Sequence, residues 1–277
     1  MNFVKRGLCT LATLACLGFG TNALAVDTQE LVDAGGIEID PSFTLGNLHK
    51  DTKPNVASEL GVVYGVMDGF NIGGGISFAS LYGMNGWTAG LNVNAMITPV
   101  DTDNIDLDVR ADFDWSLYEG YSLTPSIELN YDFEPDLAAW GLYMRFGLPI
   151  YGAGGLEMAF LDDVIGDDDD IEGADVGISL TLGAYYTYAE NYQFLIEGGF
   201  DAVNLAENFG ESGIEEAFLA LGANITFSDS FELTTELRLF LPCDDDIDDD
   251  DEFRAALTIG GVFTMGGNNS ASAGAEE

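Results

Sequence analysis

A row of charged side chains at every second position is the part of the sequence with the clearest chemistry. Between residues 105 and 117 the even positions are polar, and most carry a carboxylate: Asp106, Asp108, Arg110, Asp112, Asp114 and Ser116. The odd positions are all apolar. Successive side chains of a β-strand point to opposite faces, so this segment predicts a strand with one acidic and one apolar face. Rows of Asp and Glu facing water select cations, so ion selection is the chemistry to consider.

The length of this segment points to a membrane. Soluble strands usually run about 5–6 residues, whereas a transmembrane β-strand needs roughly 9–11. Similar segments recur along the chain, at residues 37–45, 56–66, 70–82, 87–97, 121–133, 140–148, 156–160, 176–188, 192–200, 217–227, 231–241 and 253–265. Strands that cross a bilayer must close into a barrel. The sequence therefore predicts an all-β fold, a transmembrane antiparallel up-and-down β-barrel.

The connections between these segments suggest the number of strands. Bacterial single-chain barrels have an even number of strands, short periplasmic turns and longer outer loops. Counted back from the C-terminus, the short connections are 228–230, 189–191, 151–155 and 119–120, and the long ones alternating with them are 242–252, 202–216 and 162–175. The alternation predicts about twelve strands starting near residue 56 and a periplasmic C-terminus, with about fourteen strands as the alternative.

The chain divides into four parts on this interpretation. Residues 1–25 have the basic start, the short apolar core and the Ala23-Leu24-Ala25 site of a secretory signal peptide. A lipoprotein signal with the lipid on Cys16 fits less well, because Thr13 stands where the usual motif has Leu. Residues 26–54 form an N-terminal segment, either a plug or an extra strand, and residues 55–265 the barrel. The Gly/Asn/Ser-rich residues 266–277 are predicted to be a disordered tail.

Composition excludes several classes of function. The formal net charge of −40 argues against binding nucleic acid or anionic lipid headgroups by charge. Cys243 is the one cysteine outside the predicted signal peptide, so no intramolecular disulfide is expected. The single histidine, His49, lies in a polar connection, and no Cys–His pair, Walker loop or zinc pattern is present. We therefore expect no enzymatic activity.

Aromatic residues beside the short connections are typical of membrane barrels. Girdles of aromatic side chains mark both interfaces of such proteins, although any one pair is also explained by the preference of aromatic residues for strands. The pairs are Tyr118 and Tyr121, Tyr188 and Tyr192, and Phe227 and Phe231.

Residues 56–265 resemble the bacterial outer-membrane β-barrel superfamily, the porin-like channels broadly. The resemblance rests on this architecture and involves no specific family motif. The resemblance implies location in the outer membrane, contact with its lipid, delivery by the barrel-assembly machinery and passage of small hydrophilic solutes. Two features depart from the pattern: Phe263 is followed by further residues, and Pro125 lies inside a strand segment. A secreted β-sandwich or jelly roll, which also alternates, is the competing fold.

If the apolar face meets lipid, the polar face lines the lumen. The predicted pore-lining residues are Asp106, Asp108, Arg110, Asp112, Asp114, Glu128, Asp132, Arg145, Glu197, Glu236, Arg238 and Arg254, with Glu59, Glu157 and Glu232 on the same face. Their acidic excess favours a passive, cation-favouring channel for small hydrophilic solutes. The alternative is a lumen filled by hydrogen-bonded acid and arginine ladders, although a bore of this strand number has room for water. Gly73, Gly74 and Gly75 suggest a bend or close packing in the lumen.

Two acidic runs remain, at residues 162–175 and 242–252. Such like-charge blocks are usually solvated loops, and neither run fits an EF-hand. Weak binding of a divalent cation such as Ca²⁺ is the alternative, because carboxylate oxygens are hard ligands. The candidate ligands are Asp167, Asp168, Asp169, Asp170, Asp244, Asp245, Asp246, Asp248, Asp249 and Asp250. A structural or surface-interaction protein with such loops is the second functional hypothesis. No other cofactor is expected, and the sequence does not determine the oligomeric state.

Overall fold

The described part of the protein is almost entirely β-strand. The computed structural model describes residues 32–46, 55–80, 87–102, 104–117, 120–133, 140–152, 175–188, 191–202, 216–242 and 254–266. The strands are β1 (Ile37–Gly46), β2 (Asn55–Met67), β3 (Phe70–Ser80), β4 (Trp87–Asp101), β5 (Ile105–Ser116), β6 (Gly120–Asp132), β7 (Trp140–Gly147), β8 (Ile150–Gly152), β9 (Asp175–Val176), β10 (Ile178–Tyr188), β11 (Tyr192–Ala202), β12 (Glu216–Ser228), β13 (Phe231–Pro242) and β14 (Arg254–Met265). Within these residues, no helix is long and apolar enough to cross a membrane.

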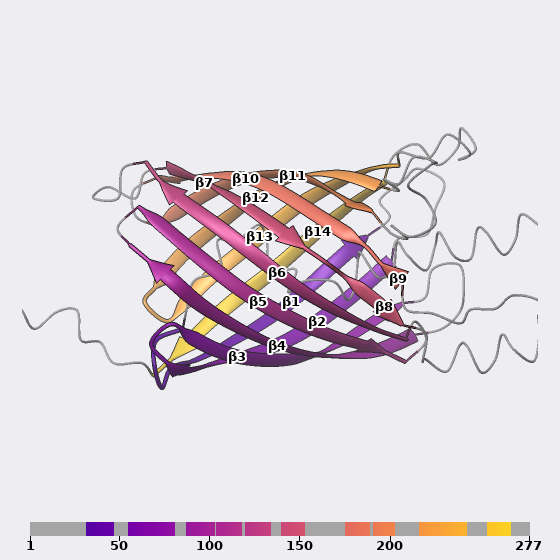
Figure 1. The fold of residues 1–277 in the computed structure, drawn as a ribbon, viewed down its shortest axis with the longest axis horizontal. Helices are drawn as coiled ribbons and strands as arrows, with labels where there is room; N and C mark the ends of the chain where they lie inside the picture. The colour runs from indigo at the N-terminus through magenta and orange to yellow at the C-terminus, as the bar shows by residue number, and fades with distance from the viewer. Residues whose placement is uncertain are drawn as a thin grey trace, which may run out of the picture.

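The strands form one closed antiparallel barrel (Figure 1). Two of the barrel strands are each interrupted once, between β7 and β8 and between β9 and β10. Pro149 lies in the first interruption and has no N–H to donate, but the ladder continues on both sides because Leu148 N donates to Pro125 O and Gly177 N donates to Pro149 O. Counted with these interruptions, the barrel has twelve strands, and the predicted all-β up-and-down barrel is confirmed.

Strand β1 closes the barrel, because it pairs with β2 on one side and with β14 on the other. The barrel therefore begins at Ile37, and the boundary predicted near residue 55 is too late by one strand. The alternation of residues 37–45 is visible in the sequence, but the predicted strand count leaves this segment over, as a plug or an extra strand. The structure shows a strand. Pro41 has only a local effect: the pairing with β14 passes from Ile39↔Phe263 to Ser42↔Gly260 without Asp40 and Pro41. The predicted segment 156–160, which the count of twelve had included in place of β1, lies outside the described residues.

Because β1 takes the place of residues 156–160 in the strand count, some connections lie at the opposite end of the barrel from the end predicted. The turn at Asp68 and Gly69, where Gly69 has φ 76°, lies at the same end as the turn between β12 and β13. The longest connections, 153–174, 203–215 and 243–253, lie at the other end. The connection from β5 to β6 belongs to this second end, so its assignment as a periplasmic turn was wrong. Likewise, the predicted turn 151–155 begins inside β8.

The chain enters the barrel along the lumen side of β2. Gly35 N donates to Gly65 O at 2.7 Å, and Gly65 N donates to Gly36 O at 3.1 Å. Gly65 faces inward, and a Cβ there would collide with the backbone carbonyls of Val32 and Asp33. Val32 is accordingly buried. A glycine is thus required where the chain before β1 crosses the inner face of the wall.

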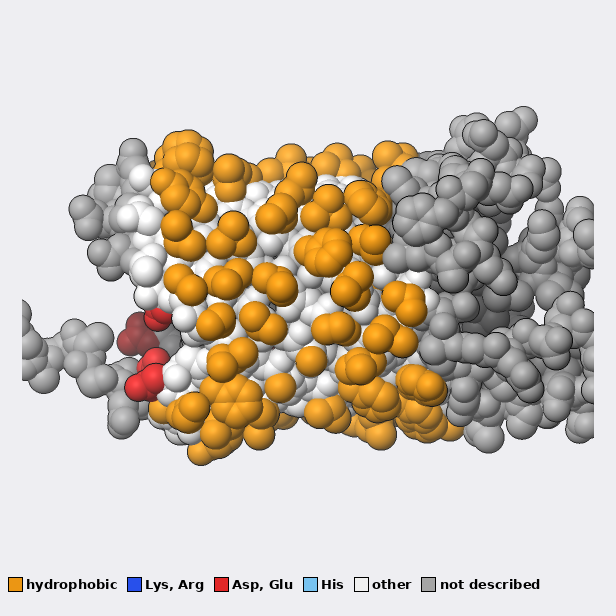
Figure 2. Space-filling view, viewed as in Figure 1, with side chains coloured by type: hydrophobic (Ala, Val, Ile, Leu, Met, Phe, Trp, Pro, Cys, Tyr) orange, Lys and Arg blue, Asp and Glu red, His pale blue; other side chains and the backbone are white. Residues whose placement is uncertain are grey.

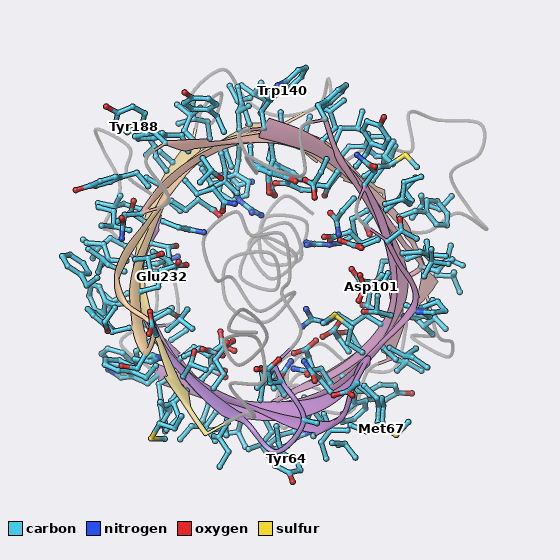
Figure 3. All side chains as sticks on the ribbon, turned by 90° about the vertical axis from the view of Figure 1, so that its left-hand side faces the viewer. Tyr64, Met67, Asp101, Trp140, Tyr188 and Glu232 are labelled. Carbon is cyan, nitrogen blue, oxygen red and sulfur yellow. The ribbon has the colours of Figure 1, made fainter. Side chains whose placement is uncertain are left out.

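The outer surface is an apolar band (Figure 2). Large hydrophobic side chains such as Leu91, Phe113 and Ile127 are exposed on it, and Tyr64, Met67, Trp140 and Tyr188 point outward (Figure 3). Aromatic rings stack along the short-turn end, with centroids 5.6 Å apart for Phe227 and Phe231 and 3.8 Å apart for Phe133 and Trp140. A sandwich would bury this face, whereas a barrel in lipid exposes it. The fold is therefore a transmembrane β-barrel, as predicted.

Tyr121 lies at the long-loop end, opposite the other two predicted aromatic pairs. Its ring stacks on Phe113 at 6.3 Å. Tyr118, its predicted partner, lies outside the described residues. Aromatic residues therefore occur at both ends of the wall, which is the arrangement expected at two membrane–water interfaces.

Candidate functional site

The inner face of the barrel carries the charged side chains (Figure 3). Residues paired across neighbouring antiparallel strands lie on the same face, so Asp108, its partner Glu128 and the partner Arg145 of Glu128 all face the lumen. Every residue of the predicted pore-lining set lies on this face, as do Glu59 and Glu232. Glu157 lies outside the described residues.

Three further lumen-facing acids were missed from the sequence. Glu38 and Asp40 belong to β1 and alternate with outward residues, so the pattern would have revealed them if β1 had been counted as a barrel strand. Asp101 pairs with Asp106 after an irregularity in the pairing between Ile97 and Val100. This bulge changes the phase of the strand and brings an odd-numbered residue to the face that even-numbered residues occupy before it.

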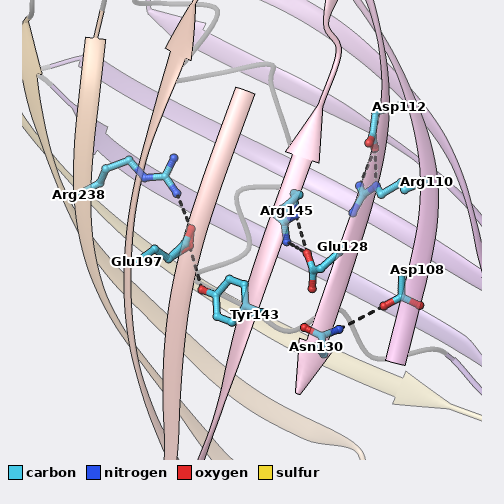
Figure 4. A network of polar contacts seen from close by, with 9 residues as sticks. All are labelled: Asp108, Arg110, Asp112, Glu128, Asn130, Tyr143, Arg145, Glu197 and Arg238. Atoms are coloured by element: carbon cyan, nitrogen blue, oxygen red, sulfur yellow. Dashed lines mark hydrogen bonds and ion pairs between the residues drawn. The ribbon is translucent and has the colours of Figure 1, made fainter. Parts of the chain in front are cut away.

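Two ion pairs run along β5, β6 and β7 (Figure 4). Arg110 contacts Asp112 Oδ1 with Nε at 2.7 Å and with Nη2 at 2.6 Å. Arg145 contacts Glu128 Oε2 with Nε at 2.6 Å and with Nη2 at 2.5 Å. Each arginine thus offsets one neighbouring carboxylate and leaves the other acids of the wall in excess.

A second network joins β7, β11 and β13. Arg238 Nε donates to Glu236 Oε1 at 2.8 Å, and its Nη2 lies 3.7 Å from Glu197 Oε1. Tyr143 Oη donates to Glu197 Oε2 at 3.2 Å. The guanidinium also lies 4.6 Å above the ring of Phe218, a cation–π distance. Here two acids share one arginine.

Neutral donors hold two further acids of the β4–β6 wall, Asp108 and Asp114. Asn92 Nδ2 donates to Asp114 Oδ1 at 2.9 Å, and Asn130 Nδ2 donates to Asp108 Oδ2 at 3.3 Å. Thr98 also donates to Asp108. These donors fix the position of the carboxylates without adding a compensating positive charge.

Two tyrosines lie against glycines on the opposite wall. Tyr143 of β7 pairs with Gly183 of β10, and Tyr185 of β10 pairs with Gly141 of β7. A Cβ on either glycine would overlap the tyrosine ring across from it. The rings therefore lie along the sheet, where they join a buried apolar cluster with Leu195 and Ala220. Aromatic rings commonly cover glycines of neighbouring strands in this way.

The basic side chains of the described residues are all arginines, and all face the lumen: Arg110, Arg145, Arg238 and Arg254. Arg254 lies 5.7 Å above the ring of Phe240. The lumen-facing acids are more numerous, and they are Glu38, Asp40, Glu59, Asp101, Asp106, Asp108, Asp112, Asp114, Glu128, Asp132, Glu197, Glu232 and Glu236. The wall is thus acidic in balance.

Several sequence predictions concern residues outside the described part of the chain. These are the signal peptide, His49, the C-terminal residues from 267 onward and both sets of candidate Ca²⁺ ligands. Among the residues that are described, no group of three or more His, Cys, Asp or Glu side chains is arranged to hold a metal ion. Divalent-cation binding by the acidic loops stays a prediction.

Comparison with known proteins supports the architecture. No family model and no curated protein matches the chain. Among solved structures it is similar to the KdgM porin, with a TM-score of 0.57 and 9% identity over 83% of this chain and 99% of that chain. The NanC porin gives 0.56 and 11% over 82% and 98%. An outer-membrane channel from Pseudomonas putida F1 gives 0.53 and 10% over 88% and 99%. At these identities the likeness concerns the fold.

Proposed function

We propose that this barrel is a passive, cation-favouring channel for small hydrophilic solutes. The observation that carries the proposal is the excess of carboxylates over arginines on the lumen face. The acids lie in a cylinder whose low-dielectric wall concentrates their field within the bore. Cations are therefore enriched inside and anions are repelled.

One of the similar solved structures bears on the charge of the preferred solute. One KdgM structure is described as a complex with oligogalacturonate, which is a polyanion. An acidic lumen does not favour such a ligand, so we expect this barrel to differ from that porin in the sign of its preferred solutes. We expect no enzymatic activity. Outer-membrane lipid and the barrel-assembly machinery are the expected partners.

Reversal potentials in a planar bilayer test the proposal. In a KCl gradient, the purified protein should conduct with K⁺ preferred over Cl⁻. Changing Asp106, Asp108 and Asp114 together to Asn should lower this preference, most at low salt, where screening is weak. This variant leaves the Arg110–Asp112 ion pair intact, so no buried arginine loses its partner.

The matched control removes the same charge from a predicted loop by changing Asp167, Asp168 and Asp169 to Asn. It should retain the selectivity of the native protein. A folded barrel, verified by its altered gel migration before boiling, that does not conduct would refute the channel. The structural or surface-interaction alternative would then be favoured, and the low exposure of Asp108 and Glu128, 4% each, already suits a closely packed wall.

A further inference from the structure

Four glycines gather on the inner face of β2, β3 and β4. Gly61 of β2 pairs with Gly75 of β3, and Gly75 pairs with Asn92 of β4. Gly73 and Gly90 lie in the two adjacent rows of the same face. We call Gly61, Gly73, Gly75 and Gly90 the glycine floor. Gly61 and Gly75 are partly exposed, whereas Gly90 is buried and the Asn94 side chain lies against Gly73.

Carboxylates border the floor on both sides. Asp40 of β1 pairs with Gly61, and Asp114 of β5 pairs with Asn92, so one row runs from one acid across the floor to the other. Glu59 stands in the next row on β2. Glu59 on β2 and Asp114 on β5 thus flank the floor, with β3 and β4 between their strands.

One of these acids has an unused oxygen. Asp40 is 5% exposed, and its Oδ1 has no hydrogen-bond partner in the described structure. Its side chain leans over the floor: Oδ2 lies 3.5 Å, and the Asp40 Cβ 3.6 Å, from where a Cβ on Gly61 would stand. A buried polar atom without a partner is costly. A cationic donor lying on the floor would satisfy it.

We propose that the glycine floor binds small organic dications, compounds with two amino groups, between Asp40 and Glu59 on one side and Asp114 on the other. An ammonium group donates to carboxylates in strong, charge-assisted hydrogen bonds. The methylene chain between two amines would lie over Gly61 and Gly75, the pair of glycines at the centre of the row. The role of this site in transport rests on the proposed channel, to which it adds a preferred class of solute. Binding at the site does not require conduction.

The separation of the acids distinguishes an organic dication from a metal ion. Mg²⁺ needs near-ideal octahedral oxygen geometry and dehydrates reluctantly. The described acids offer no group of three that could hold a metal, and those of the floor are distributed over β1, β2 and β5. Putrescine carries the same charge as Mg²⁺ but distributes it over two separated amines, so it should bind more tightly.

Isothermal titration calorimetry on the folded barrel in detergent tests the site with putrescine. Native protein should show saturable binding. The double variant Asp40→Asn, Glu59→Gln should weaken the affinity for putrescine about tenfold or more, because charge-assisted hydrogen bonds are lost. The double variant Asp106→Asn, Asp132→Asn removes the same charge from the lumen away from the floor. It should change the affinity less than about twofold, because it lowers only the overall electrostatic field of the lumen.

A further variant separates shape from charge. Gly61→Ala meets Asp40 at ordinary contact distance, so the barrel should fold. The added methyl group covers the floor and should weaken putrescine binding by about threefold or more with the net charge unchanged. Equal weakening by the two double variants, Mg²⁺ binding as tight as putrescine, or no saturable binding by native protein would each overturn the site. Conductance measurements without putrescine test the channel separately.

Discussion

The two halves of the lumen wall are built differently. On β2 to β5 many inward residues are short or acidic, among them Gly75, Asn92 and Asp114. Neutral donors hold Asp108 and Asp114, whereas Arg110 pairs with Asp112. On β7 and β10 to β13 many inward residues are aromatic or form an arginine network, among them Tyr143 and Arg238. The first half carries more carboxylates than arginines and has glycines on its inner face. The second neutralises much of its charge and covers its glycines with rings. One closed sheet thus joins an acidic, glycine-rich wall to an aromatic one.

The largest expected effect tests the alternation on which both walls depend. Val109→Arg on β5 places a charge in lipid and should lower the free energy of unfolding by roughly 2–4 kcal/mol if the site lies near the membrane midplane. Asp108→Asn, one residue away, faces the lumen and keeps a side chain able to bond Thr98 and Asn130. Its cost should be much smaller. Urea unfolding in lipid vesicles measures both, and equal costs would contradict the assignment of the two faces.

A matched pair of glycine substitutions compares the packing of the two walls. Gly183→Ala forces the Tyr143 ring to move and should cost about 1–3 kcal/mol, as overpacking does. Gly61→Ala meets only ordinary contacts and should stay within about 0.5 kcal/mol of native stability. The same unfolding assay ranks them. A larger loss for Gly61→Ala would show that the floor is packed and the contrast is mistaken.

The smallest expected effect concerns the network of Arg238 with Glu197 and Glu236. Arg238→Gln leaves Glu197 and Glu236 without their shared arginine. The K⁺ preference should then rise, by about twofold in the permeability ratio, because two carboxylates are released into the field of the bore. Arg238→Lys retains the charge and is the control, with little change expected. A fall in K⁺ preference on Arg238→Gln would place the selecting charges outside this network.

The alternation of single strands was sufficient to predict which residues face the lumen. Asp106 to Asp114 could be assigned because the period of two is intrinsic to one strand. Asp101 could not, because the bulge that turns it inward depends on pairing with β5. Likewise, residues 37–45 are left over in the sequence because an even count of strands is reached with residues 156–160. The neighbours that make this segment a barrel strand, β2 and β14, are known only once the barrel closes.

The glycine floor and the Tyr143–Gly183 contact were also beyond the sequence. The Gly73 to Gly75 run suggested close packing or a bend in the lumen, but not that Gly61 on β2 and Asp40 on β1 share a row with Gly75. Such rows depend on the register between strands. That register is set jointly by all turns and bulges around the barrel.

The seam between β1 and β14 has a consequence for how the protein is made. Leu45 pairs with Leu257, and Thr44 Oγ1 lies 3.0 Å from Thr258 Oγ1, although these threonines are 214 positions apart. The last strand to be synthesised therefore supplies the partner of the first. Until it arrives, β1 and β13 each have an unpaired edge that lipid cannot satisfy. Assembly must keep the early strands sheltered and then complete the circle in one late step, so a chain that stops before Arg254 should fail to insert rather than form a smaller barrel.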